Sequence, residues 1–221
     1  MKVCTDACIL GSYTASLLKK PGYHFKKILD IGSGTGLLSL MLAQKSDALI
    51  ESIEIDFQSY QQAATNFTLS KWKERLHIVN TNIKTFYPRI KYDLIISNPP
   101  FYEHDLISPD EKKNIAKHNA GLTIVDLLET AQRNLTAAGH LSVLLPFHRI
   151  IEFKTLATHY NLSLCSELLI KHSIEHDVTR CILIFGKQME KFYSQDLVIY
   201  NTLNMYSTEF ISLLKDYYLY L

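Results

Sequence analysis

The feature that most constrains the fold is a strand, a glycine-rich turn and a helix in immediate succession over residues 26–45. This segment reads KKILDI, then GSGTG, then LLSLMLAQK. Gly32, Gly34 and Gly36 alternate with small polar residues, and glycine is the residue that accepts positive φ and lets the backbone approach a neighbour closely. A short apolar strand that runs through such a turn into a helix is typical of the first half of a βαβ unit. We therefore expect an α/β fold.

The rest of the chain repeats this alternation. Six more strands are predicted at ALIESIEI, LHIVN, YDLIIS, GHLSVLLPF, LSLCSELLI and RCILIFGK, with helical segments between most of them. Strands that alternate with helices of this length indicate a parallel sheet covered on both faces. The last two strands are close in sequence and are expected to form an antiparallel edge pair. The prediction is a doubly wound, Rossmann-like sheet of about seven strands, mostly parallel, whose ligands bind beyond the carboxyl ends of the strands.

Helix ends are predicted from capping residues. A helix over residues 7–19 has Thr5 or Asp6 as its expected N-cap. Another helix begins at Thr123, where Asp126 has the spacing of a capping box. The tyrosine-rich end of the chain, TEFISLLKDYYLYL, is expected to form an amphipathic helix.

The length favours one elaborated domain over residues 1–221, because the chain is too short for two full domains. Within it we distinguish an N-terminal segment, residues 1–27, and a C-terminal strand and helix extension, residues 190–221. No apolar run approaches the roughly 20 residues that span a bilayer. The start of the chain carries Asp6 in its apolar stretch and has no small-residue cleavage site, which argues against a signal peptide. No membrane association is expected.

The composition is that of an ordinary soluble protein, with 47% hydrophobic residues and 20% charged residues. The net charge of +1 means that any nucleic acid would have to be bound through local patches. The cysteines Cys4, Cys8, Cys165 and Cys181 form no CxxC pair and have no histidine cluster at metal spacing beside them. They are expected to be reduced structural thiols of a cytoplasmic protein, without a metal.

The glycine-rich turn is compatible with three kinds of nucleotide site, or with close packing alone. A P-loop ends in Gly-Lys-Ser/Thr, and this turn contains no lysine. A dinucleotide site follows G-x-G-x-x-G. The pattern here is G-x-G-x-G after Asp30, and it is similar to that of class I S-adenosylmethionine-dependent methyltransferases. In those enzymes the acidic residue can interact with the ammonium group of the cofactor.

The next two strands end in residues that suit an adenosyl group. Glu54 is near the carboxyl end of the second strand, and its acceptor-only carboxylate suits two ribose hydroxyls, a role that Asp56 can share or replace. The alternative is an exposed acidic strand end. Asn82 follows the third strand where related enzymes usually carry Asp for the adenine amino group, and its carbonyl oxygen still accepts. Ile83 would then lie against the adenine face.

The fourth strand ends in Asn98, Pro99, Pro100 and Phe101. The two prolines can simply break the strand. The alternative is a pocket for an exocyclic amino group, whose delocalised lone pair is a poor nucleophile until its N–H bonds are directed to acceptors. The Asn98 side-chain carbonyl and the Pro99 backbone carbonyl are candidate acceptors, and Pro100 has no N–H to compete for them. Phe101 or Tyr102 offers a flat face for a base.

On these motifs the chain resembles the class I N-methyltransferases with an Asn-Pro-Pro-Phe/Tyr motif. Within them it is similar to the bacterial tRNA1(Val) adenine-N6 methyltransferases. The resemblance covers essentially the whole chain, including KVCTDACILGSY, LDIGSGTGLLSLMLAQ, YDLIISNPP and YSTEFISLLKDYYLYL. It implies methyl transfer from S-adenosyl-L-methionine to N6 of the adenosine 3′ of the anticodon. The implied partner is a tRNA anticodon stem-loop, and a monomer is favoured.

The resemblance also implies roles for individual residues. Thr5 and Asp6 would lie over the cofactor, which is surrounded by Asp30, Gly32, Gly34, Glu54 and Asn82. The target adenine would be held by Asn98, Pro99 and Phe101. A basic cluster after this motif would grip the RNA phosphates: Lys112, Lys113, Lys117 and His118. Two residues depart from the family pattern, Cys4 in place of Gly and Asn82 in place of Asp. The short aromatic and basic leader usual before the first family motif is not in this sequence.

Three other functions remain as alternatives. A protein glutamine N5-methyltransferase for a release factor would use the same acceptors, but such enzymes carry a separate N-terminal helical domain, and about 27 residues precede the first strand here. A guanine-N2 RNA methyltransferase would use the same pocket for a different base. A non-catalytic cofactor-binding partner would be favoured by a lost Asn98 or a broken glycine turn, and the sequence retains both.

Overall fold

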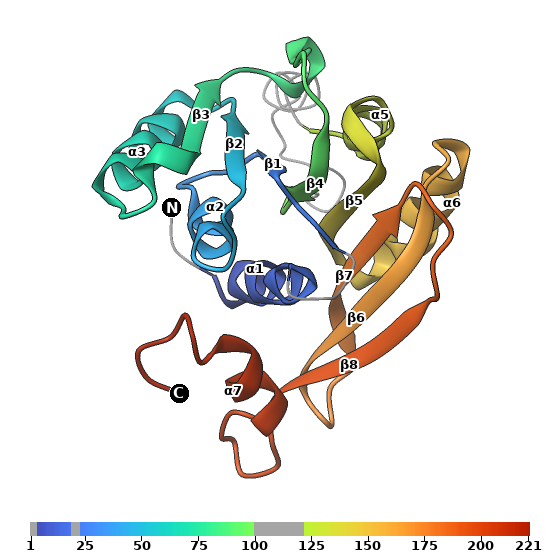
Figure 1. Ribbon diagram of the computed structural model, residues 1–221. Helices are drawn as coiled ribbons and strands as arrows, with labels where there is room; N and C mark the ends of the chain where they lie inside the picture. The colour runs from blue at the N-terminus through green and yellow to red at the C-terminus, as the bar shows by residue number, and fades with distance from the viewer. Residues whose placement is uncertain (1–3, 19–22, 100–121) are drawn as a thin grey trace, which may run out of the picture.

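A single twisted sheet forms the centre of the computed structural model, which describes residues 4–18, 23–99 and 122–221 (Figure 1). Among these residues the sheet has eight strands in the order β3-β2-β1-β4-β5-β7-β6-β8. The strands are β1 (Lys27–Ile31), β2 (Leu49–Glu54), β3 (Leu76–Asn80), β4 (Tyr92–Ser97), β5 (Leu135–Pro146), β6 (Ser163–Ser173), β7 (Val178–Gly186) and β8 (Tyr193–Tyr200).

Helices connect these strands. The α-helices are α1 (Thr5–Leu17), α2 (Leu37–Ala43), α3 (Phe57–Leu69), α5 (Ile124–Asn134), α6 (Ile150–His159) and α7 (Thr208–Leu214). Within the described ranges there are also three short 3₁₀ turns, η1 (Lys73–Arg75), η2 (Ile83–Thr85) and η3 (Phe147–Arg149). No helix among the described residues is both long enough and apolar enough to cross a membrane.

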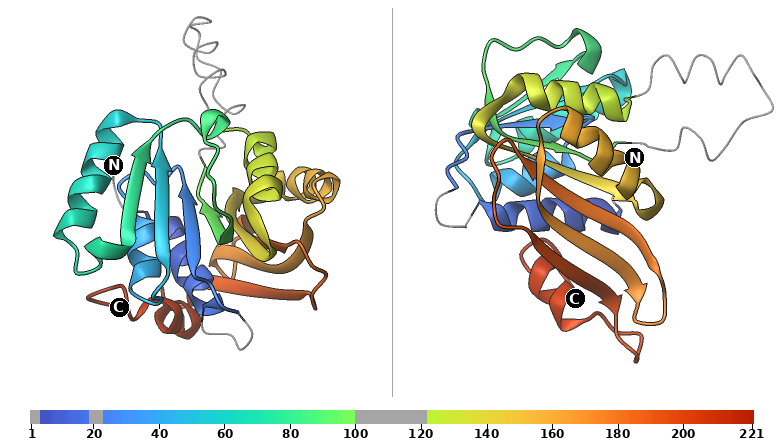
Figure 2. Two further views of the ribbon diagram at one scale, coloured as in Figure 1. Left: turned by 45° about the horizontal axis from the view of Figure 1, so that its top comes forward. Right: turned by 90° about the vertical axis from the view of Figure 1, so that its right-hand side faces the viewer.

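The pairing of the strands confirms the predicted doubly wound α/β sheet. β1 pairs in parallel with β2 on one side and with β4 on the other, and β3 and β5 extend the parallel part outward. β7 runs antiparallel to both β5 and β6. The expected number of about seven strands was one short, because β8 of the C-terminal extension pairs in parallel with β6. The antiparallel pair is therefore not at the edge of the sheet, and β8 forms that twisted edge (Figure 2).

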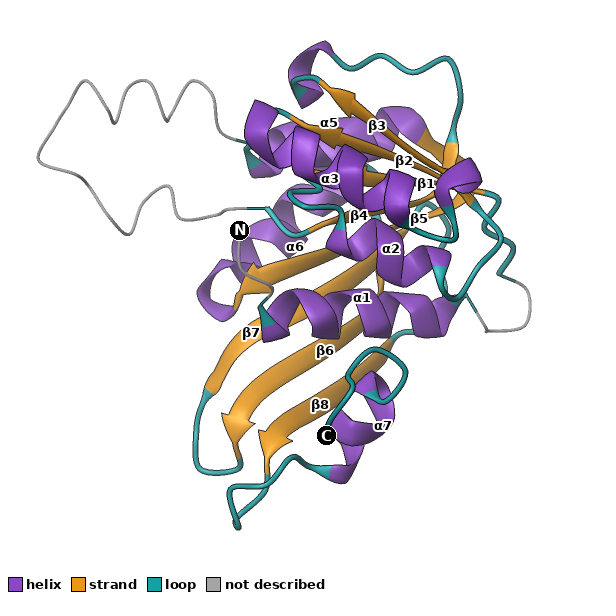
Figure 3. Cartoon of the chain, turned by 90° about the vertical axis from the view of Figure 1, so that its left-hand side faces the viewer, coloured by secondary structure: helices purple, strands orange, loops and turns teal. Residues whose placement is uncertain are grey.

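Alternation along the strands divides the core into two layers. In β7, Ile182 and Ile184 belong to one buried cluster, whereas Cys181, Leu183 and Phe185 belong to the other. The first cluster lies under α1, α2, α3 and α7, which stand in front of the sheet in Figure 3. The second lies under α5 and α6. Successive strand residues point to opposite faces, so a strand buried on both sides reads as a continuous apolar run.

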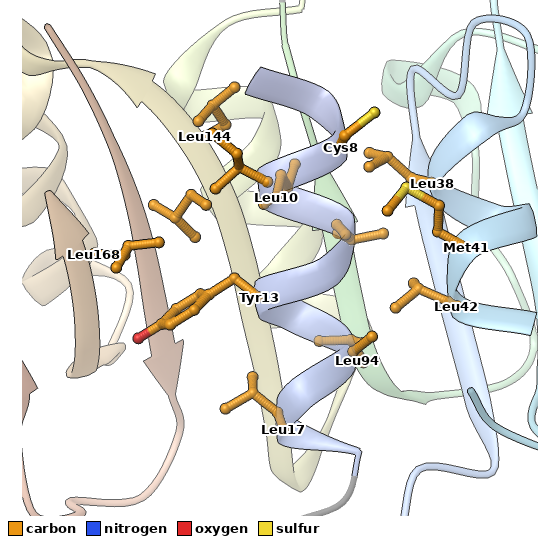
Figure 4. Packing of buried hydrophobic residues seen from close by; sticks show 14 of the residues in the cluster. Cys8, Leu10, Tyr13, Leu17, Leu38, Met41, Leu42, Leu94, Leu144 and Leu168 are labelled. Atoms are coloured by element: carbon orange, nitrogen blue, oxygen red, sulfur yellow. The ribbon is translucent and has the colours of Figure 1, made fainter. Parts of the chain in front are cut away.

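Helix α1 is fixed to the sheet by apolar packing (Figure 4) and also by two buried hydroxyl pairs. The Tyr13 hydroxyl is 2.6 Å from Ser166 Oγ in β6, and Thr14 Oγ1 is 2.7 Å from Ser142 Oγ in β5. On the α2 side, a Cβ on Gly11 would lie 2.6 Å from Met41 Sδ, so the missing side chain lets α1 and α2 pack closely without a shift of Met41. The N-terminal helix is thus attached both to the sheet and to the helix that follows the glycine turn.

Two predicted helix ends were wrong, and one was confirmed. The N-cap of α1 is Cys4, not Thr5 or Asp6, because the Cys8 amide already bonds to the Cys4 carbonyl at 3.2 Å. At the C-terminus, α7 ends at Leu214, not at the end of the chain. The amides of residues 217 and 218 both turn back to the Leu214 carbonyl, and their tyrosine rings pack against the core. The capping box of Thr123 and Asp126 is present at the start of α5.

A polar cluster lies beneath the glycine turn, on the α2 side of the sheet. The Asp30 side chain is completely buried, and its Oδ2 accepts a 2.7 Å hydrogen bond from Ser39 Oγ. Ser39 Oγ is also 2.8 Å from Ser52 Oγ, so the cluster joins β1, α2 and β2. Asp30 Oδ1 has no hydrogen-bond partner. Burial raises the pKa of Asp30 from 3.8 to about 7, and the hydrogen bond from Ser39 only partly offsets this effect.

We expect Asp30→Asn to stabilise the ligand-free protein at neutral pH. The pKa of Asp30 is higher in the folded state, so between about pH 4 and 7 the unfolded chain binds fewer protons, and the free energy of unfolding falls as pH rises. The variant lacks this loss, which is on the order of a few kcal/mol. Urea unfolding at pH 4 to 8 measures it: the variant's advantage should grow up to about pH 7 and then level off. The fully exposed Asp47, changed to Asn, is the matched control. An advantage independent of pH would contradict the expectation.

Candidate active site

The glycine turn between β1 and α2 has a backbone that only glycine adopts easily. Gly32, Gly34 and Gly36 have φ values of 70°, 56° and 81°. These lie in the left-handed region, which other L-residues rarely enter. At Gly36 there is also no space, since a Cβ would lie 2.4 Å from the Phe67 ring. The Gly32 amide bonds to the Ile53 carbonyl at 2.9 Å, which holds the turn against the end of β2.

Glu54 ends β2 directly beside this turn. Its carboxylate is buried and accepts one backbone hydrogen bond on each oxygen, from Gly34 N and from Asp56 N, both at 2.8 Å. Asp56, the alternative to Glu54 in the sequence analysis, instead caps α3 by accepting a 2.8 Å bond from Ser59 N. That bond holds the pKa of the Asp56 carboxyl below its usual value. Glu54 is therefore the oriented carboxylate at this strand end.

A first pocket opens next to Glu54, at the carboxyl ends of β1, β2 and β3. Its apolar walls and its few polar groups suit a flat heterocycle. Asn82 lines it as the N-cap of η2, with Oδ1 accepting a 2.9 Å bond from Lys84 N, and Ile83 follows it, almost fully buried. The lining residues are Ile31, Gly32, Ile53, Ile55, Thr81, Asn82, Ile83 and Leu122.

The structure separates Asp30 from this pocket. The carboxylate lies below the turn, between Ser39 and Ser52, and none of it is exposed. Asp30 thus supports the turn from beneath. Its contact with a cofactor ammonium group stays a prediction.

Asn98 follows β4, the strand next to β1, so it lies at the same edge of the sheet as the glycine turn. Ser97 is paired with Ile31 in the sheet register, and its hydroxyl donates a 2.8 Å hydrogen bond to the Ile31 carbonyl. A second pocket begins here, with Asn98 half-buried and Pro99 buried. It is lined by Cys4, Asp6, Asn98, Pro99, Leu144, Leu145, Pro146 and Arg180.

The structure brings together some of the predicted site residues and not others. Asp6, in the first turn of α1, lines the second pocket with Asn98 and Pro99. Thr5 is exposed and is not part of either pocket lining. The remaining predicted residues lie outside the described part of the chain: Pro100, Phe101, Tyr102, Lys112, Lys113, Lys117 and His118.

Several pocket residues were not identified from the sequence. Thr81 and Leu122 belong to connecting segments around the first pocket, and nothing in their local pattern separates them from ordinary loop residues. Arg180 lies near the start of β7, and its side chain forms a 3.4 Å ion pair with Asp6. A sequence signal existed for Arg180, because it is a single cation directly before the apolar run CILIF.

The chain matches a known domain family. The model of the family described as methyltransferase small domain matches residues 12–157. Solved structures show the same fold at low identity. A predicted O-methyltransferase from Agrobacterium tumefaciens superposes with a TM-score of 0.73 at 16% identity, covering 96% of each chain. A methyltransferase from Pyrococcus furiosus gives 0.59 at 20% identity, covering 81% of this chain and 83% of its own.

Curated relatives match over nearly the full length. A tRNA1(Val) (adenine(37)-N6)-methyltransferase of Flavobacterium psychrophilum is 35% identical over 99% of this chain and 93% of its own. Enzymes of the same name from Dyadobacter fermentans and Tolumonas auensis are each 36% identical over 99% of this chain, covering 91% and 90% of their own lengths. The chain belongs to the tRNA1(Val) (adenine(37)-N6)-methyltransferase family.

Proposed function

We propose that this protein transfers the methyl group of S-adenosyl-L-methionine to N6 of adenosine 37 in a tRNA, with tRNA1(Val) as the first candidate. The observation that carries the proposal is the placement of Asn98 and Pro99 beside the glycine turn, on adjacent strands joined by the bond from Ser97 to Ile31. Relatives that carry this activity in their names match 99% of the chain.

The residues of the first pocket fit the cofactor. Glu54 offers two oriented carboxylate oxygens beside the pocket, each with a lone pair left for a ribose hydroxyl. Ile53, Ile83 and Leu122 provide apolar faces for an adenine ring, and Asn82 stands at its edge. The positive-φ glycine turn permits a ligand to approach the backbone closely. When bound, the cofactor supplies an electrophilic methyl group on a sulfonium sulfur.

In the second pocket, Asn98 and Pro99 supply acceptors for the two N–H bonds of the target amino group. When those hydrogens are held by the Asn98 side-chain oxygen and the Pro99 carbonyl, the nitrogen lone pair is left facing the methyl donor. Orientation of this kind is worth effective molarities of roughly 10⁵–10⁸ M in well-aligned reactions. The acceptors also stabilise the positive charge that develops on nitrogen. After transfer the nitrogen is acidic and releases its proton to water, so the chain needs no dedicated base for this step.

The choice of adenosine 37 is physically consistent with a pocket at the carboxyl edge of the sheet. The nucleotide next to the anticodon lies in a single-stranded loop, so moving its base into the pocket requires less unpairing than flipping a base from a duplex. The relatives' names favour adenine N6 over the two alternative acceptors, the amide of a release factor and guanine N2.

Purified protein with labelled S-adenosyl-L-methionine is expected to methylate an unmodified valine tRNA and to produce N6-methyladenosine at position 37. Nuclease digestion and mass spectrometry identify the product and its position. A transcript with guanosine at position 37 is the matched control and should take up no label. Transfer to a release factor with none to any tRNA would overturn the proposal.

Asn98→Ala is expected to lower kcat by about 10²–10³, the loss that follows removal of one preorganised polar partner from a reacting group. Binding of S-adenosyl-L-methionine, measured by calorimetry, should stay within about twofold, because Asn98 lies in the second pocket rather than the first. If cofactor binding were lost with activity, Asn98 would serve the cofactor instead.

Glu54→Gln is expected to weaken cofactor binding by about tenfold or more. Both carboxylate oxygens accept backbone hydrogen bonds, and an amide presents an NH₂ group to one of those two N–H donors. Calorimetry with S-adenosylmethionine should show the loss in affinity, while thermal unfolding shows that the fold persists. Asp56→Asn keeps an oxygen for capping α3 and serves as the control, with an unchanged dissociation constant. Equal affinity of Glu54→Gln and the wild type would exclude Glu54 as a cofactor ligand.

A further inference from the structure

Arg180 reaches the pocket of Asn98 from the antiparallel half of the sheet. It is paired with Pro146 in the register of β7 with β5, and β5 lies between β7 and β4 (Figure 1). Because β7 runs antiparallel, its first residues stand at the edge where β4 and β5 end. The Arg180 side chain lines the same pocket as Asn98, Pro99 and Pro146. It therefore supplies positive charge to the pocket that holds the proposed amino-group acceptors.

The guanidinium of Arg180 is only loosely engaged. Its Nε lies 3.4 Å from Asp6 Oδ2, longer than the roughly 2.7–2.9 Å of a tight charge-assisted bond. One NH group also donates to the Thr179 carbonyl at 3.0 Å. The side chains of Arg180 and Asp6 are 33% and 35% exposed, and ion pairs with this exposure contribute little to stability. Arginine has five N–H donors in a fork that matches a phosphate, so donors remain for a ligand.

One residue that borders the pocket lining in sequence carries an exposed aromatic ring. Phe147 follows Pro146 directly, at the start of η3, and is 45% exposed. The next phenylalanine in the chain, Phe153, is by contrast fully buried in the core between α6 and the sheet. An exposed aromatic ring offers a stacking surface, and any nucleobase has a face that can stack on it.

We propose that Arg180 and Phe147 form the contact surface for the nucleotides that flank the target adenosine. Arg180 binds a backbone phosphate next to the extruded base, and Phe147 stacks on a neighbouring unpaired base. This inference rests on the proposed function, since it concerns the RNA substrate of the same site. It places the RNA over the end of β5 and the start of β7, on the opposite side of Asn98 from the cofactor pocket.

Asp6 acts in this arrangement as the partner of Arg180 before RNA binds. The Asp6 carboxylate holds the guanidinium over the pocket, and an RNA phosphate replaces that carboxylate. Arg180 therefore has one ion pair both before and after RNA binds, and its side chain keeps the same orientation.

Fluorescence anisotropy with a labelled anticodon stem-loop tests the surface independently of methyl transfer. Arg180→Gln is expected to weaken RNA binding by about tenfold and to reduce the slope of log K against log salt by about 0.7, the value for one phosphate contact on a single strand. Phe147→Ala should weaken binding at least about fivefold with the slope unchanged, because stacking releases no counterion. Arg180→Lys keeps the charge and should restore the salt slope.

Two controls separate phosphate binding from a structural role. Arg89→Gln removes an exposed arginine from the loop before β4, at the opposite edge of the sheet, and should leave both affinity and slope unchanged. Asp6→Asn breaks the ion pair and should keep the full slope of log K against log salt. If the pair were purely structural, Asp6→Asn and Arg180→Gln would change RNA affinity and this slope equally.

Cofactor affinity should stay within twofold in Arg180→Gln and Phe147→Ala. A wild-type protein that methylates tRNA, together with unchanged RNA affinity and slope in Arg180→Gln, would overturn this inference and leave the proposed function standing. A wild type that neither binds nor methylates tRNA would overturn both.

Discussion

The arrangement of this site depends on the pairing of β1 with β4, which the hydrogen bond from Ser97 to the Ile31 carbonyl closes at the carboxyl edge. One such bond contributes only about 1 kcal/mol. The bond matters because of where it lies. It joins the ends of β1 and β4, and the sheet extends from β1 in both directions. The chain leaving β1 turns into α2, on the face opposite α5. The chain leaving β4 continues from Asn98. Two pockets open at this carboxyl edge, one lined by residues at the end of β1 and one by residues that follow β4, as at the switch point of other open α/β sheets.

The polar cluster under the glycine turn lowers the stability of the fold close to the proposed active site. The cluster lies between the sheet and α2, where apolar residues would otherwise fill the core. It consists of Asp30 in β1, Ser52 in β2 and Ser39 in α2 itself. A buried carboxylate with one unpartnered oxygen is unfavourable by itself. Polar groups of this kind in a protein core occur more often at functional sites than in the rest of the core. Here the cluster joins the three elements that meet below the turn, and so fixes the backbone on which the cofactor would rest.

The sequence was sufficient for the parts of the fold that follow from local patterns. The apolar runs located seven strands, and the turn GSGTG identified the end of β1, because both signals depend on neighbours in the chain. It failed where distant contacts decide. The tail after Leu214 has the periodicity of a helix, but Tyr217 and Tyr218 gain more by packing on the core. A strand was expected in the C-terminal extension, but its place beside β6 at the edge of the sheet was not. The sequence marks Arg180 as a cation at the start of a strand, but only the antiparallel insertion of β7 brings it to the pocket of Asn98.

On the proposed function, strand order also places a cation where a nearly neutral protein meets its polyanionic substrate. With a net charge of +1, the whole molecule attracts RNA weakly over long distances, so recognition depends on charges placed at the pocket itself. The antiparallel insertion of β7 between β5 and β6 brings the beginning of a strand to an edge otherwise made of strand ends. A cation before the apolar run of β7 then faces the same pocket as the amide after β4. In a purely parallel sheet, the residue before that run would stand at the other edge, far from the substrate. The antiparallel strand therefore does more than extend the sheet, since it adds the side chains preceding its core to the active edge.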